Sequence, residues 1–145
     1  MKLQGSTEID MESKRLYEIL SDPEAIAKLV PGIQSFEKDG EEVKMEVMVG
    51  YSFIRGKFNV RIKLTHADGS HVEVKGSGNG SGTSIDFLSK FDIRQNGDDK
   101  GSSILSWDAD VNVGGIAATM GSGMIKPAAD KFISQVIEAL KKSAE

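Results

Sequence analysis

The sequence lacks cysteine altogether and has only three prolines, two histidines and one tryptophan among 145 residues. Without cysteine there can be no disulfide, no thiolate zinc or iron–sulfur site and no thiol nucleophile. This composition fits a reducing compartment. We therefore expect a cytoplasmic protein, with at most peripheral contact at the inner face of the membrane.

The chain also lacks an excess of charge and long hydrophobic runs. Eighteen basic and twenty-two acidic residues give a formal net charge of −4, without long blocks of one sign. A nucleic-acid-binding protein needs a basic face to displace counterions from phosphates, so we exclude that class. No run approaches the ~18 apolar residues of a membrane span, and the first residues lack the apolar segment of a signal peptide.

Catalytic and metal-binding motifs are missing as well. There is no G-x-S-x-G motif and no serine with an evident base beside it. His66 and His71 flank the turn at Asp68, but zinc needs three or four convergent ligands, so we expect solvated turn residues and no metal. His66 shares the alternation of Leu64, which places it near the rim of any interior. We expect neither a cofactor nor enzymatic activity.

The pattern that is present begins with a strand over residues 2–10, followed by two short helices. Asp22 is suited to cap the second helix, and Pro23 fits its first position because the missing N–H is not needed there. Pro31 and Gly32 then end the helical region.

From residue 33 to residue 113 apolar and polar residues alternate, which indicates antiparallel strands with one face on the core. Turn signals separate the runs, at Asp39-Gly40, Asp68-Gly69, residues 76–82 and Asn96-Gly97. The glycine-rich stretch 76–82 predicts a mobile hairpin tip that could serve as a lid.

After Gly115 the helical period returns, and a stripe from Ile125 to Leu140 predicts a long amphipathic helix. Pro127 should kink or restart this helix. A sheet with one apolar face and one amphipathic helix are best satisfied by packing together. We predict one α+β domain over residues 1–145, with a curved antiparallel sheet of about six or seven strands wrapped around the C-terminal helix.

This order resembles the helix-grip superfamily of START and birch-pollen-allergen-like domains, and within it the CoxG family of carbon monoxide dehydrogenase subunits. The matching segments are Met1–Gly5, Leu16–Glu24, Val30–Gly32, Gly56–Phe58 and Asp108–Gly115. The resemblance implies a cavity for a hydrophobic ligand between the sheet and the last helix. It also implies the family's partners, since members accompany molybdenum-containing CO dehydrogenases, help place them at the membrane and are linked to quinone handling.

An inward apolar set gives the candidate lining of this cavity, although the same residues also fit a plain packed core. Its members are Met45, Val47, Phe53, Phe58, Val60, Ile62, Phe87, Phe91, Trp107, Met120, Met124 and Phe132. Met120 and Met124 flank a flexible Gly121-Ser122-Gly123 segment, our candidate for a mobile gate.

Three functions remain open at this point. The first is non-catalytic binding of a lipid or quinone-like small molecule. The second is docking on a molybdenum hydroxylase, or its recruitment to the membrane, without a ligand of its own. The third is an enzyme of the cyclase or dehydratase type, which needs an ionisable group in the cavity and has His66, Tyr17 and Tyr51 as candidates.

Overall fold

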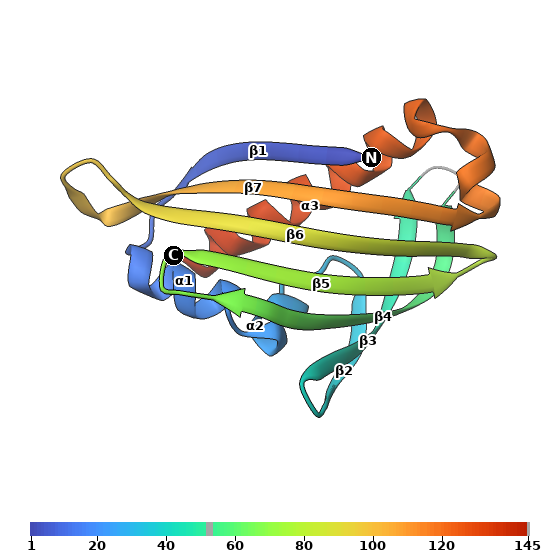
Figure 1. The fold of residues 1–145 in the computed structure, drawn as a ribbon, viewed down its shortest axis with the longest axis horizontal. Helices are drawn as coiled ribbons and strands as arrows, with labels where there is room; N and C mark the ends of the chain where they lie inside the picture. Colours follow the sequence, from blue (N-terminus) through green and yellow to red (C-terminus); the bar gives the residue numbers. More distant parts are fainter. Residues whose placement is uncertain (52–53, 145) are drawn as a thin grey trace.

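A computed structural model describes residues 1–51 and 54–144 of the chain. A seven-stranded sheet curves around one long C-terminal helix, α3 (Figure 1). The elements follow in the order β1 (Lys2–Ile9), α1 (Ser13–Leu20), α2 (Pro23–Ala27), β2 (Ile33–Asp39), β3 (Glu42–Tyr51), β4 (Ile54–Ala67), β5 (His71–Gly80), β6 (Thr83–Asn96), β7 (Asp99–Gly115), η1 (Ile116–Met120) and α3 (Ser122–Ser143). The predicted α+β class and helix-grip element order are confirmed.

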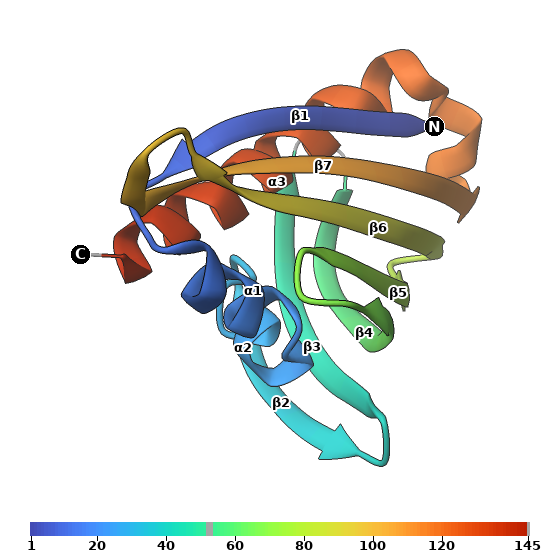
Figure 2. The same ribbon diagram turned by 60° about the vertical axis from the view of Figure 1, so that its left-hand side comes forward.

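The sheet has the strand order β1-β7-β6-β5-β4-β3-β2, and every neighbouring pair is antiparallel. Strands β2 to β7 form a meander, and β1 joins it beside β7, with Gly5 opposite Trp107. Figure 2 shows β3 and β4 turned steeply away from the direction of β1, β6 and β7. The sheet therefore presents a concave face, and α3 lies on that face.

The two short helices form for the reasons that the sequence indicates. The Asp22 carboxylate accepts a hydrogen bond of 3.1 Å from the backbone N–H of Glu24, and Pro23 occupies the first helical position of α2. In α1, Leu16 and Leu20 lie one turn apart and are both buried. This face anchors α1 beneath the sheet.

Buried residues form two clusters rather than one continuous core. One cluster joins α1, β1, β6, β7 and the end of α3, and the other joins α2 to β3, β4 and β5. Tyr17 and Phe91 are partly buried and pack against both clusters. They therefore mark the junction between the two halves of the interior.

The glycine-rich stretch is not the hairpin tip that the sequence predicted. β5 continues to Gly80, so the turn consists of Ser81 and Gly82 alone. A Cβ atom on Gly76 would lie 2.1 Å from the ring of Phe87, and one on Gly80 would lie 2.3 Å from the Lys57 carbonyl oxygen. These glycines make room for neighbouring strands and side chains, because they are strand residues at close contacts.

Two local expectations also need correction. A bulge after Leu64 shifts the register of β4 so that His66 lies opposite Glu73, and His66 therefore points outward instead of toward the interior. The reason is that one extra residue in a strand reverses the face of every following side chain. Pro127 lies inside α3, which continues from Ser122 to Ser143, so it does not restart the helix.

Candidate functional site

The middle of the concave face is less tightly packed than its margins. Of the predicted lining, the residues beside α2 and at the β3–β4 pair are buried, namely Met45, Val47, Phe58 and Ile62. Those nearer the centre of the sheet and on α3 are half-buried, namely Val60, Phe87, Phe91, Trp107 and Phe132.

Two predicted lining residues lie elsewhere. Met120 and Met124 are 38% and 50% exposed, at the η1–α3 junction. Phe53 lies outside the described residues.

α3 has a buried side chain in its first turn, Ile125, and another near its C-terminal end, Leu140. The middle of α3 contacts the end of β3. The Tyr51 hydroxyl donates a 2.5 Å hydrogen bond to Gln135 Oε1. The rings of Tyr51 and Phe132 pack edge-on, with their centroids 6.3 Å apart. Burial raises the pKa of Tyr51. These contacts hold the β3 side of the sheet against the middle of the helix.

A cleft of about 310 Å³ opens on the opposite side of α3, along β1. Its apolar lining includes Leu3, Trp107, Ile133 and Ile137, and its polar lining comprises Gln4, Ser6, Thr7, Asp130, Ser134, Glu138 and Lys141. A second cleft of about 250 Å³ lies farther along, between the ends of β1 and β7 and the start of α3. Of the residues predicted to line a ligand cavity, Trp107 lines the larger cleft.

The concave face carries hydroxyls but no charge. Across residues 1–51 and 54–144, the inward positions of the central sheet in β1 and β3–β7 hold no Asp, Glu, Lys or Arg. Thr7, Thr83 and Ser89 are inward on β1 and β6, and Tyr17 faces the interior from α1. Sequence reasoning passed over the three strand hydroxyls, although Ser89 between Phe87 and Phe91 interrupts an apolar alternation.

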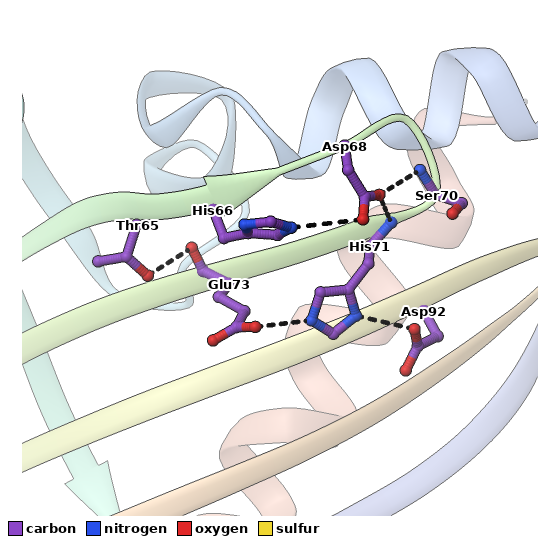
Figure 3. Close-up of polar contacts among 7 residues, drawn as sticks. All are labelled: Thr65, His66, Asp68, Ser70, His71, Glu73 and Asp92. Atoms are coloured by element: carbon purple, nitrogen blue, oxygen red, sulfur yellow. Dashed lines mark hydrogen bonds and ion pairs between the residues drawn. The ribbon is translucent and has the colours of Figure 1, made fainter.

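Both histidines, His66 and His71, lie on the outer face of the β4–β5 hairpin, next to several carboxylates (Figure 3). The Nδ1 atom of His71 lies 2.8 Å from a carboxylate oxygen of Asp92, and its Nε2 atom lies 2.8 Å from one of Glu73. The Nε2 atom of His66 lies 3.3 Å from a carboxylate oxygen of Asp68. Both carboxylates raise the pKa of His71, Asp92 more than Glu73. The cluster is on the side of the sheet away from α3.

Asp68 organises the turn between these histidines. Its carboxylate accepts backbone hydrogen bonds from Ser70 at 3.1 Å and His71 at 2.8 Å, which lower the pKa of Asp68 to about 2, with a further contribution from His66. Within the described part of the chain, no group of three or more His, Asp or Glu side chains is arranged to hold a metal ion. The hydrogen bonds of Asp68 hold the turn, and those of His71 join β5 to β6 on the outer face.

Three carboxylates of β6 and β7 are exposed on the outer face of the sheet, namely Asp92, Asp108 and Asp110. Among the residues that the structure describes, no helix combines the length and hydropathy that a bilayer crossing requires.

Comparison with solved structures gives matches over nearly the whole chain. A conserved protein from Geobacillus kaustophilus shares 23% identity at a TM-score of 0.90, covering 99% of this chain and 95% of that one. A START superfamily protein from Mycobacterium smegmatis shares 16% identity at a TM-score of 0.73, covering 99% and 96%. The protein XoxI from Bacillus cereus shares 12% identity at a TM-score of 0.69, covering 98% and 94%. These likenesses establish a START-like fold.

Comparison with curated protein sequences gives no match. The family model of CoxG, described as a subunit of carbon monoxide dehydrogenase, matches residues 5–145. Because this match spans almost the entire chain, the protein belongs to the CoxG family.

Proposed function

We propose that the protein binds a hydrophobic small molecule, such as a lipid or a quinone, between the concave face of the sheet and α3. The observation that carries the proposal is the set of half-buried apolar side chains there, among them Val60, Phe87 and Phe132. Well-packed interiors leave few voids, so apolar groups that keep partial exposure beneath a helix favour a space that a ligand fills.

The size and lining of the cleft along β1 support this function. Its volume of about 310 Å³ lies at the lower end of the roughly 300–1,000 Å³ typical of ligand pockets. It suits a compact ligand or one section of an elongated one. The ionisable groups of this cleft, Asp130, Glu138 and Lys141, lie on α3, whereas the inward positions of the sheet supply apolar groups and hydroxyls. We infer a non-catalytic role, because groups of the latter kind bind and orient a ligand but do not act as a general acid or base.

Access to this site is assigned to the η1–α3 junction. Met120 and Met124 are exposed there, and a Cβ atom added at Gly121 or Gly123 would meet nothing within 4 Å. Flexible thioether side chains on a loosely surrounded segment adapt to ligands of irregular shape. We therefore assign these two methionines to a gate.

The second candidate function is docking on a molybdenum-containing CO dehydrogenase-type enzyme, or its recruitment to the membrane. The family description, which names a subunit of carbon monoxide dehydrogenase, favours an accessory role. The two functions are compatible, because a carrier of a redox-active ligand must meet the enzyme that exchanges electrons with that ligand.

Native mass spectrometry after incubation with a membrane lipid extract tests the binding function. The wild-type protein should carry a discrete added mass that organic extraction removes. Val60→Phe fills an inward, half-buried position and should lose the adduct, whereas Asn59→Phe, at the neighbouring exposed position, should keep it. A wild-type protein free of any adduct would contradict the binding function and favour the docking role.

A further inference from the structure

We propose that the site is selective for an uncharged ligand whose polar end is a carbonyl or hydroxyl group, held by the hydroxyls of Tyr17 and Ser89. This inference rests on the proposed binding function and adds the chemistry and the location of the polar end. It places that end at the α1 side of the interior and the apolar remainder along α3.

Tyr17 places a hydroxyl at the junction of the two buried clusters. Its side chain packs against both clusters but keeps partial exposure. The hydroxyl makes no hydrogen bond within the described residues, yet no fully buried side-chain polar atom there lacks a partner. The Tyr17 hydroxyl therefore keeps some accessible surface, and a ligand atom that reaches it can take the hydrogen bond that the protein does not supply.

Ser89 supplies a second hydroxyl on the same concave face. It lies inward on β6 between Phe87 and Phe91, with the small Ala109 opposite it on β7 and Val74 opposite it on β5. It is half-buried and makes no side-chain hydrogen bond within the described residues. A serine in the middle of an apolar stripe weakens packing, so an unpartnered, half-buried one on this face is suited to a ligand oxygen.

The absence of charge on this face decides the kind of polar end. A carboxylate or ammonium group moved into an apolar interior is strongly disfavoured unless an opposite charge meets it. The inward positions of the central sheet offer none among the described residues. Lys141, with Asp130 and Glu138, belongs to α3 at the cleft along β1, so an anionic head could be held there but not beside Tyr17 and Ser89.

Three probes of equal chain length test the inference: 1-dodecanol, dodecanoate and dodecane, each delivered from cyclodextrin at pH 8. The fluorescence of Trp107, the single tryptophan, reports binding because its side chain lines the cleft. We expect dodecanol to bind about a hundredfold more tightly than dodecanoate, since the acid must lose its charge or bury it.

Conservative variants then locate the polar end. Tyr17→Phe and Ser89→Ala should each weaken dodecanol binding about threefold to tenfold, the ratio expected for one hydrogen bond, and leave dodecane binding unchanged. Ser77→Ala, at an exposed outward position of β5, is the matched control and should change neither affinity. Unchanged dodecane binding also shows that each variant keeps its fold.

The failures are distinguishable. If no probe binds the wild-type protein, the binding function fails and this inference fails with it. If dodecanol and dodecane bind equally in every variant, the binding function is supported but the polar subsite at Tyr17 and Ser89 is wrong. If dodecanoate binds as tightly as dodecanol and Lys141→Met abolishes that binding, the polar end lies at the cleft mouth and the inference is overturned.

Discussion

The two ends of α3 are built differently. At the C-terminal end, Leu140 is 1% exposed and packs with Leu16 of α1 and Leu105 of β7, which are also buried. At the N-terminal end, Ile116 is 62% exposed and Met124 is 50% exposed, next to two glycines with open space around them. One helix therefore joins a tightly packed end of the molecule to a loosely packed one.

This difference separates the tasks of stability and access. Burial of large apolar side chains stabilises the fold, whereas openings and ligand entry need segments with few such contacts. The proposed gate lies at the loose end and the proposed polar subsite lies near the packed end. A ligand would thus enter apolar surface first and reach its hydrogen-bonding partners last.

The largest expected effect is loss of the packed end. Leu140→Ala should lower the free energy of unfolding by about 2–5 kcal/mol, because it removes buried methyl groups and leaves a cavity. Met124→Ala should change it by about 0.5 kcal/mol or less, as for most exposed positions. Urea denaturation of the two variants measures both values, and equal losses would break the contrast between the ends.

A smaller effect is expected in the sheet between the ends. Gly76→Ala should destabilise the fold by about 1–3 kcal/mol, because the added methyl group meets the ring of Phe87, 2.1 Å away in the native arrangement. Phe87→Leu should relieve part of this cost. A double-mutant cycle of Gly76→Ala and Phe87→Leu measures the coupling. Gly78→Ala replaces Gly76→Ala in a comparison cycle, because a Cβ atom on Gly78 would meet Val60, at 3.1 Å, instead of Phe87. Additive losses would show that Phe87 is not the obstacle.

These glycines also show where sequence reasoning succeeds and fails. The alternation of apolar residues predicted the sheet and its inward face, because that period depends on the strand alone. Residues 76–82 were assigned to a hairpin tip, although residues 76–80 belong to β5, since a glycine required by a neighbour's ring looks the same in sequence as one required by a turn. The outward turn of His66 was missed for a related reason, because a bulge carries no strong local signal.

The site was predicted less completely than the fold. The alternation of apolar residues identified which side chains lie on the concave face. It could not predict that Met45 is buried while Phe87 is half-buried, because that difference depends on the curvature of the sheet and on where α3 crosses it. The cleft along β1 was missed because Leu3 and Ile133 meet only through the path of α3. Patterns within one element therefore fix which residues face inward, and packing between elements decides which of them stay open.

The smallest expected effect concerns pH and the outer surface of the packed end. The β4–β5 hairpin joins that end through the 2.8 Å hydrogen bond from the Ile93 N–H to the Ser70 carbonyl oxygen, because Ile93 belongs to the cluster around Leu140. Asp92 and then Glu73 raise the pKa of His71 above its ordinary value of 6.5. Protonation of His71 is thus more favourable in the folded state than in the unfolded state.

The raised pKa means that this stabilisation is fully present below pH 6.5 and is lost as the pH rises through the folded-state value. His71→Gln should lower the melting temperature by about 1–2 °C at pH 5.5, as expected for a surface ion pair, and by less at pH 8.5. His66→Gln is the control, because among the described residues the His66 ring is hydrogen-bonded to one carboxylate, that of Asp68, whereas the His71 ring is hydrogen-bonded to two. Differential scanning calorimetry of both variants at the two pH values measures the difference. A His71→Gln deficit that grows with pH would reverse the sign and show that the carboxylates do not hold His71 as a cation.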